Sequence, residues 1–458
     1  MKNGEYKYYF LFVLLVAGIS FVPFFLSYGG INSDAVAYFK LAKEFPQVTS
    51  NLFPIGYPLL LKLGYYFTHE FYFSSRIISV LSFSVIGLFS YYKKFYFKET
   101  ILLLSFRFYF SLYMNSFSET IFLSIVYFLI YYFHEYISGY KKRGKFIVPA
   151  SLLTIYMVMI RYSGVYIYIG IGFFLIYHTI RNNLFLKILS QSYFYYYLFS
   201  LVGIAIYLSF NYYNFNSFFG EQIRGVPDIA DWKMFTYDNL LGVINVINPV
   251  FSIKLKNYFG LSILLITIDL LFLLIIIIFY SKNLKKITAF HQMLLITGVT
   301  YLILMFGSEY KQSIEPLNMR MLAPASVLLC FSILIVLFKV YPSKKNYMFA
   351  LGCFSVFFTL INQLKNPVNF LSHKFKIDRI VKEKEGVKYF YDDIPNEKNI
   401  SIYRIPFTNK KIKYIHPYMQ SGFINSTIVR TYNPNIVLIK SDSTIRNKNL
   451  IIYNSELR

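Results

Sequence analysis

The chain has 458 residues, of which 56% are hydrophobic, 21% aromatic and only 15% charged, and its formal net charge is +24. Soluble domains carry about 25% charged residues, and the two cysteines are too few for a disulfide framework. A soluble enzyme, a disordered chain and a disulfide scaffold are therefore excluded. Apolar runs of about 20 residues recur, which is long enough for a helix to cross a bilayer.

Hydropathy and charge divide the chain into a membrane body over residues 1–363 and a charged tail over residues 364–458. The apolar runs of the body predict eleven spans, at about 8–27, 74–92, 100–113, 119–137, 146–160, 162–180, 193–210, 258–280, 288–306, 321–338 and 347–363. No small-residue cleavage site follows the first run, so we expect a retained anchor rather than a signal peptide. The predicted fold class is an all-α polytopic membrane protein.

Basic residues are concentrated in alternate loops, and this pattern predicts the orientation. If the N-terminus is cytoplasmic, the cytoplasmic loops carry 17 Lys and Arg in 49 residues, against 9 in 112 residues for the loops on the other side. Positive charge marks the cytoplasmic side of membrane proteins, so we expect this orientation in a plasma membrane. The Lys/Asn/Ile-rich composition favours a bacterium. The net charge is then largely a topology signal, and no nucleic acid is expected as a partner.

The tail carries 25 charged residues in 95, and an odd number of spans places it outside the cell. Short β-like runs separated by Asn, Pro and Gly predict strands. They are expected at Ile400–Ile405, Ile412–Ile415, Ile436–Ile439 and Leu450–Tyr453, after a helix at about Lys374–Glu385. We expect a small extracytoplasmic α/β domain over residues 364–458, which would help to bind an acceptor or simply cover the outer face.

Two outward loops, 28–73 and 211–257, are long enough to hold structure of their own. In the first loop, apolar residues at helical spacing predict a surface helix from about Asp34 to Glu44. Pro58 suits the first turn of a second surface helix. Because the elaborated loops all belong to one face, we expect the functional surface on that face.

Four short motifs, by their order along the chain and their predicted place on the outer face, resemble those of a known family. They are Gly56-Tyr57-Pro58-Leu-Leu-Leu behind Asp34, Tyr113-Met-Asn-Ser-Phe-Ser118-Glu119, Ile160-Arg161-Tyr-Ser-Gly164 and Asn318-Met-Arg320-Met-Leu-Ala-Pro324. Together they resemble the GT-C superfamily of polyprenyl-phosphate-sugar glycosyltransferases, which includes protein O-mannosyltransferases and the bacterial aminoarabinose transferase of lipid A. The resemblance covers residues 1–363. Met321 stands where the family has Tyr, and Ala35 stands where many members carry a second acid.

The resemblance implies an inverting transfer of a sugar from a polyprenyl-phosphate donor to a hydroxyl of a lipid, glycan or protein acceptor on the outer face. Such a transfer needs a base to accept the hydroxyl proton and cations to stabilise the leaving phosphate. Asp34 is implied as the catalytic base, and its alternative role is that of a helix N-cap. No cofactor is expected, with a divalent metal ion as the open alternative.

Cations on the outward loops are the candidates for binding the donor phosphate, because a guanidinium fork matches phosphate oxygens. They are Arg320, Arg161, Lys311 and Arg224. Their alternative role is snorkelling to lipid head groups. The candidates for binding substrate are Glu119, Tyr57 and Glu221. Favourable interaction with a helix N-terminus is the alternative for Glu119, and a solvated loop is the alternative for Glu221.

Three further residues keep an open role. Arg107 and Asp269 lie within predicted spans, where a charge is functional by default, and Trp232 suits sugar stacking or interfacial anchoring. No zinc-site or phosphate-loop motif occurs, so a zinc enzyme and an ATP-driven pump are not expected. The alternatives to a glycosyltransferase are a lipid-linked glycan transporter or flippase and a non-catalytic protein of envelope polysaccharide assembly.

Overall fold

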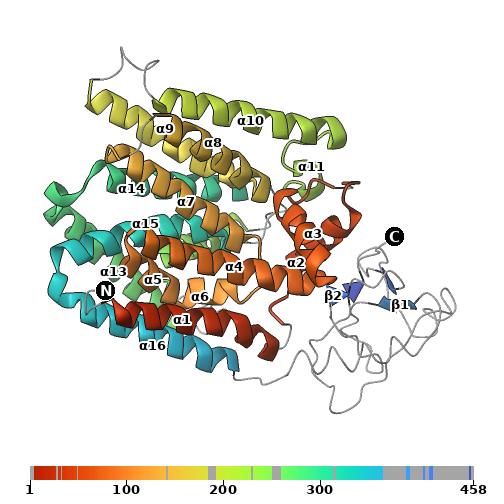
Figure 1. Ribbon diagram of the computed structural model, residues 1–458, viewed down its shortest axis with the longest axis horizontal. Coiled ribbons are helices and arrows are strands. Elements are labelled where there is room, and N and C mark those ends of the chain that lie inside the picture. Colours follow the sequence, from red (N-terminus) through yellow and green to blue (C-terminus); the bar gives the residue numbers. More distant parts are fainter. Residues whose placement is uncertain are drawn as a thin grey trace.

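The computed structural model describes residues 5–26, 29–31, 33–48, 50–140, 143–183, 192–227, 229, 231–249, 259–312 and 316–364, together with four short strands between 388 and 454. Long helices lie side by side in one bundle (Figure 1). Two short helices, α2 (Ser33–Glu44) and α3 (Gly56–Thr68), pack across one end of it. We call this the α2–α3 end, and the other the opposite end.

The bundle is formed by helices at all eleven positions where the sequence predicts a span. They are α1 (Tyr6–Phe21, followed by the 3-10 turn η1, Val22–Phe25), α4 (Phe71–Tyr92), α5 (Phe97–Ser105), α6 (Arg107–Tyr113), α7 (Glu119–Ile137), α8 (Arg143–Ile160), α9 (Gly164–Arg181), α10 (Ser192–Phe215), α13 (Phe259–Lys282), α14 (Ala289–Glu309), α15 (Met319–Val340) and α16 (Lys345–Leu364). Short 3-10 turns η4 (Leu284–Lys286) and η5 (Pro342–Lys344) precede α14 and α16.

Seven helical stretches within the described residues are long and apolar enough to cross a membrane. They are Tyr6–Phe25, Phe71–Tyr92, Glu119–Ile137, Gly164–Arg181, Ser192–Phe215, Ala289–Glu309 and Ala323–Val340. Together with the helical content, they confirm a polytopic α-helical membrane protein. The count of eleven spans and the orientation of the bundle stay predictions.

The third predicted span, 100–113, is not one helix but two, α5 and α6, separated at Phe106. That residue has an extended backbone with ψ of 139°, so helical hydrogen bonding stops there. Side-chain and loop groups satisfy the freed backbone donors. The amide of Arg107 donates to Ser355 Oγ at 2.6 Å, and the amide of Phe108 donates to the carbonyl of Pro249 at 3.0 Å. Such replacement partners are what make a broken helix tolerable inside a membrane protein.

The second long loop, predicted as an outer-face loop over 211–257, partly lies inside the bundle. It contains α12 (Trp232–Ile244) and the 3-10 turn η3 (Asn245–Ile247). Val246 is 1% exposed, and its carbonyl accepts a hydrogen bond from Ser326 Oγ at 2.5 Å. Ser326 lies seven residues into α15, about 10 Å along the helix axis. The chain therefore dips into the bundle as far as the break between α5 and α6.

Both surface helices predicted in the first loop are present, and they pack on each other. The rings of Tyr38 on α2 and Tyr57 on α3 meet edge to face at 5.0 Å. At the start of α3, a Cβ on Gly56 would lie 2.7 Å from the carbonyl oxygen of Met159. Only glycine permits this close approach of α3 to α8.

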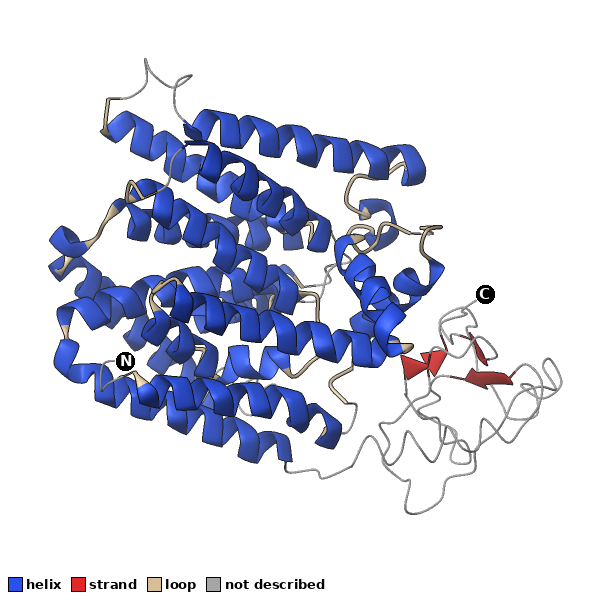
Figure 2. Cartoon of the chain, in the orientation of Figure 1, coloured by secondary structure: helices blue, strands red, loops and turns tan. Residues whose placement is uncertain are grey.

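The described part of the tail consists of two pairs of parallel strands, drawn in red in Figure 2. β1 (Lys388–Tyr391) pairs with β3 (Ile412–Ile415), and β2 (Pro406–Phe407) pairs with β4 (Tyr453–Asn454). The predicted strand at 412–415 is present, and the strand predicted at 450–453 overlaps β4 at Tyr453. The predicted helix at 374–385 and strands at 400–405 and 436–439 lie outside the described residues.

Candidate functional site

Four charged residues from four separate parts of the chain meet at the α2–α3 end. Asp34 lies in the first turn of α2, Glu119 begins α7, Arg161 lies in the turn between α8 and α9, and Arg320 is the second residue of α15. We call them the four-residue cluster. Each of them is a site residue that the sequence predicts.

The cluster is a chain of alternating charges. Arg320 Nη1 donates to Asp34 Oδ2, and Arg320 Nε lies 3.5 Å from Glu119 Oε1. On the far side of the glutamate, Arg161 Nη1 lies 2.7 Å from the same Oε1. The side chain of Glu119 is 2% exposed, whereas that of Asp34 is 27% exposed. Asp34 is therefore the carboxylate of the cluster that a substrate can reach.

Helix starts place the backbone of two residues of the cluster, Arg320 and Glu119. Asn318 caps α15, because its Oδ1 accepts hydrogen bonds from the amides of Arg320 at 3.0 Å and Met321 at 3.3 Å. This cap fixes Arg320 in the first turn of the helix. Glu119 also occupies a first turn, where a negative charge interacts favourably with the helix dipole. The helix-dipole role considered for Glu119 therefore coexists with its membership of the cluster, whereas Asp34 is the second residue of α2 rather than its N-cap.

Neutral hydroxyl groups hydrogen-bond to the charged side chains of the cluster and to one another. The hydroxyl of Ser118 lies 2.9 Å from that of Tyr38, accepts from Arg161 Nη1 at 3.2 Å and donates to Glu119 Oε2 at 3.3 Å. Burial raises the pKa of Tyr38 to about 12, so its hydroxyl keeps its proton near neutral pH. Tyr57 is fully buried against Tyr38, and its hydroxyl has no hydrogen-bond partner among the residues that the structure describes.

The carboxylates hold both arginines of the cluster in the charged form. Burial alone would lower the pKa of Arg161 and of Arg320, but Glu119 and Asp34 outweigh it and raise the pKa of both guanidinium groups. The ring of Phe117 lies 5.1 Å from the guanidinium carbon of Arg320 and adds a cation–π contact. Two positive and two negative groups therefore balance inside the cluster.

Arg224 lies beside the cluster without a carboxylate of its own. It ends the short helix α11 (Glu221–Arg224) and donates to Gln312 Oε1 at 3.1 Å and to the carbonyl of Leu52 at 3.0 Å. Burial lowers the pKa of Arg224, and the charge of Arg161 contributes to this shift. Within the described ranges no acid forms an ion pair with Arg224, so it adds one uncompensated positive charge to this end of the bundle.

Two predicted site residues are not part of this arrangement. Lys311 is exposed just beyond α14, and no ion pair joins it to the cluster in the part of the chain that the structure describes. Glu221 accepts hydrogen bonds from Ser217 Oγ at 2.8 Å and from the amides of Phe218 at 3.1 Å and Phe219 at 2.7 Å. These bonds lower the pKa of Glu221 although burial opposes the shift. Glu221 thus stabilises its own turn.

The residues with an open role have structural partners away from the cluster. The guanidinium carbon of Arg107 lies 5.1 Å from the centre of the Phe358 ring at the α5–α6 break. Asp269 Oδ1 accepts from Asn248 Nδ2 at 2.6 Å. Trp232 stacks on Tyr310, with ring centres 5.8 Å apart.

Sequence reasoning missed a buried cation, Arg76 on α4. Its side chain is among the buried polar groups at 5% exposure. It donates from Nη1 to the carbonyl of Met114 at 2.5 Å and from Nη2 to Ser116 Oγ at 3.0 Å. The signal that could have found it is its position inside the predicted span 74–92, because charges within spans are rare.

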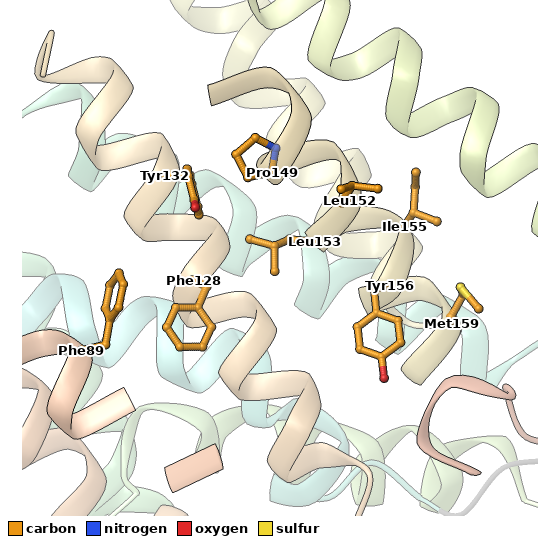
Figure 3. A pocket seen from close by; sticks show the side chains of 9 residues that line it. All are labelled: Phe89, Phe128, Tyr132, Pro149, Leu152, Leu153, Ile155, Tyr156 and Met159. Carbon is orange, nitrogen blue, oxygen red and sulfur yellow. The ribbon is translucent and has the colours of Figure 1, made fainter. Parts of the chain in front are cut away.

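An apolar slot lies on the side of the bundle between α4, α7 and α8 (Figure 3). Its volume is about 620 Å³, and its lining residues are Phe89, Phe128, Tyr132, Pro149, Leu152, Leu153, Ile155, Tyr156 and Met159. Along α8 the slot covers about 15 Å from Pro149 to Met159. Met159 is two residues before Arg161, so the slot ends close to the four-residue cluster.

The arrangement joins an accessible carboxylate and three arginines at one end of a membrane bundle, and the apolar slot on the side of the bundle ends near them. Among the described residues, no three His, Cys, Asp or Glu side chains gather in a way that could hold a metal ion. Comparisons with protein-family models, with curated proteins and with solved structures found no match to the chain.

Proposed function

We propose that the chain is an integral membrane glycosyltransferase of the GT-C type. It would transfer a sugar from a polyprenyl-phosphate donor to a hydroxyl of a lipid, glycan or protein acceptor on the extracytoplasmic face. The observation that carries the proposal is the meeting of Asp34, Glu119, Arg161 and Arg320 at one end of the bundle. A base beside several cations is what this reaction requires.

In the proposed reaction Asp34 is the general base. The acceptor oxygen attacks the anomeric carbon of the sugar while its proton passes to the Asp34 carboxylate. The bond between the anomeric carbon and the phosphate oxygen breaks, and its electron pair leaves with the polyprenyl phosphate. A single displacement of this kind inverts the configuration at the anomeric carbon.

The donor phosphate would compete with Asp34 for Arg320. In the structure Arg320 is engaged by the carboxylate, whereas among the described residues the donors of Arg224 reach a carbonyl and an amide oxygen. Arg224 can therefore turn to an anion without leaving an acid unpaired. As the phosphate draws Arg320 towards itself, the Asp34 carboxylate becomes free to accept a proton. Donor binding would in this way prepare the base for the acceptor.

The apolar slot supports a lipid-linked donor. Its lining side chains are mostly apolar, as Figure 3 shows, and an isoprenoid chain in the bilayer could pack against them without leaving an apolar environment. Met159, at one end of the slot, is two residues before Arg161 in the sequence. A chain in the slot would therefore present its phosphate at the arginines.

The sidedness of the site can be tested without any substrate. Gln47, just after α2, is exposed at the α2–α3 end, and the two native cysteines, Cys330 and Cys353, can be replaced by serine. A cysteine introduced at Gln47 should react with a membrane-impermeant thiol reagent on intact cells. Reaction only after the cells are opened would place the site in the cytoplasm and contradict the proposed orientation.

The activity is tested with purified wild type, Asp34→Asn and the matched control Asp238→Asn on a panel of polyprenyl-phosphate sugars. Asp238 is a half-buried acid on α12 outside the cluster. Loss of a general base lowers turnover by 10²- to 10⁴-fold, so Asp34→Asn should lose about 1000-fold while Asp238→Asn stays within about twofold of wild type. Full turnover by Asp34→Asn would refute the role of the base.

A different outcome would favour transport. If wild type and both variants leave every donor intact, yet all three move a lipid-linked sugar across liposomes, the chain is a transporter and the four-residue cluster has no catalytic role. Inactivity in both assays would leave a non-catalytic role in polysaccharide assembly as the surviving alternative.

A further inference from the structure

Arg76 is a buried cation that the proposed reaction does not use. It lies near the start of α4 at 5% exposure, and in the described part of the chain no carboxylate forms an ion pair with it. Burying a charge without an opposite charge is costly. A buried arginine kept at such a position is therefore expected to have a specific task.

Both ends of the Arg76 fork bind a single turn, residues 114–118. Nη1 binds the carbonyl of Met114 at 2.5 Å, and Nη2 binds Ser116 Oγ at 3.0 Å. The neighbouring Ser75 Oγ lies 2.8 Å from the same Ser116 oxygen. The turn is thus held to α4 at two points by one planar group, which a lysine cannot reproduce.

The same turn also receives the chain segment that leads to Asp34. The amide of Ser116 donates to the carbonyl of Gly30 at 2.7 Å. Gly30 has a φ of +76°, and a Cβ there would collide with the carbonyl oxygen of Met114. This left-handed backbone and close approach both require glycine. The segment is therefore seated directly against the turn that Arg76 holds.

Each carboxylate of the cluster lies a few residues from the contact between Gly30 and the turn 114–118. Asp34 follows Gly30 by four residues, and Glu119 follows Ser116 by three. Both carboxylates contact one guanidinium group, that of Arg320. The distance between the two carboxylates therefore has to match the distance between the donors that contact them, Nη1 and Nε. A shift of the turn relative to Gly30 would change that separation directly.

We infer that Arg76 is a positioning residue, which fixes the turn 114–118 against Gly30 and thereby sets the distance between the Asp34 and Glu119 carboxylates. The inference rests on the proposed function for its kinetic consequence only. Arg76 touches neither the carboxylates nor any reacting atom, so its effect is exerted through the turn.

The kinetic test compares Arg76→Gln with the matched control Arg107→Gln, another arginine within a bundle helix that does not contact the turn. Misplacement of a reacting group by about 1 Å costs about 100-fold in rate. The turnover number of folded Arg76→Gln should therefore fall about 100-fold, while its KM for the donor stays within about threefold of wild type. Arg76→Lys keeps the charge but not the fork, and its turnover number should lie between those of Arg76→Gln and wild type.

The structural test needs no substrate. Hydrogen exchange of peptides covering 112–118 should be at least about tenfold faster in Arg76→Gln than in wild type, because the turn is no longer held against the Gly30 carbonyl that the Ser116 amide donates to, whereas peptides of α14 should be unchanged. If Arg76→Gln fails to fold, Ser116→Ala removes one acceptor of the fork and should give the same changes at about half the size in free energy, about tenfold in turnover and about threefold in exchange.

These two tests separate the inference from the proposed function. Faster exchange in the turn with no transferase activity in wild type would refute the proposed function but keep the positioning role. Unchanged exchange at 112–118, or a turnover number equal to wild type in Arg76→Gln or Arg76→Lys, would overturn the inference.

Discussion

The two ends of the helical bundle treat charged groups differently. At the α2–α3 end, Asp34 and Arg320 are 286 residues apart in sequence and meet in a site where Glu119 is 2% exposed. At the opposite end, Lys98 and Glu5 lie 3.7 Å apart with side chains 28% and 31% exposed, and Arg181 donates to Tyr177 four residues away. Figure 1 shows both sets of helix ends.

Under the proposed function, this difference separates charges that mark the cytoplasmic side of the membrane from charges that take part in the reaction. Partly exposed pairs such as Lys98–Glu5 contribute little to stability. Burying charge is costly, and a buried pair often stabilises no more than an apolar replacement would. A buried cluster drawn from four elements therefore indicates a function beyond stability.

The largest expected effect on stability is at the centre of the cluster. Glu119→Gln leaves Arg161 without its carboxylate and weakens the hold on Arg320, and removing one partner of a buried pair costs about 3–5 kcal/mol. The matched change at the opposite end, Glu5→Gln, should cost less than about 0.5 kcal/mol. Unfolding of purified protein in mixed detergent measures both values. Equal losses would remove the distinction between the two ends.

The two ends can also be compared through the stability cost of replacing one glycine at each end by alanine. Gly30 and Gly139 both have a φ of +76°, but only Gly30 has a backbone atom in the path of a new Cβ, since nothing lies within 4 Å at Gly139. Strain alone should cost Gly139→Ala about 1 kcal/mol, whereas Gly30→Ala adds a collision with Met114 and should cost about 2–3 kcal/mol. A smaller loss of stability in Gly30→Ala than in Gly139→Ala would show that the Gly30–Met114 contact can shift to admit a Cβ at little cost.

Arg224 sharpens the comparison through binding rather than stability. Hydrogen bonds to a charged group are worth about 1.5–3 kcal/mol, so Arg224→Gln should raise the KM for a polyprenyl-phosphate donor at least about tenfold. Arg181→Gln at the opposite end should leave the KM unchanged. Donor titrations in one detergent system measure both. A normal KM in Arg224→Gln would remove this arginine from the phosphate site.

The smallest expected effect concerns Glu221, whose pKa is lowered by hydrogen bonds from its own turn although burial opposes the shift. A lowered pKa means that these bonds stabilise the fold above the ordinary carboxyl pKa, and that this contribution is lost as pH falls through the lower folded value. Wild type should therefore melt slightly above Glu221→Gln at pH 7, and the gap should close below about pH 4. A gap that widens in acid would contradict this sign.

The positions of the bundle helices could be predicted because they depend on local apolar length. The helix at 119–137 and the surface helix ending at Glu44 appear with the predicted bounds. The break at Phe106 and the descent of Val246 into the bundle could not be predicted in this way. Both depend on partners far along the chain, such as Ser355 and Ser326, which hydropathy does not reveal.

The site shows the same limit. Asp34, Glu119, Arg161 and Arg320 were selected through motifs, but their pairing into one alternating chain is a property of the packed bundle. Glu221 stood in a similar loop pattern and turned out to bond within its own turn. The position of Arg76 inside a predicted span marks it as unusual, but its partners, 38 and 40 residues away, are revealed only by the packed bundle.

The central claim is that the cluster works as one unit around Asp34 and Arg320, and a double-mutant cycle tests it most directly. Transfer rates are measured for wild type, Asp34→Asn, Arg320→Gln and the double variant with one donor. Residues that act together show strongly non-additive losses, so the double variant should be no more than about threefold slower than the slower single variant. Losses that multiply across the two sites would show that the carboxylate and the arginine act independently, and would contradict the account.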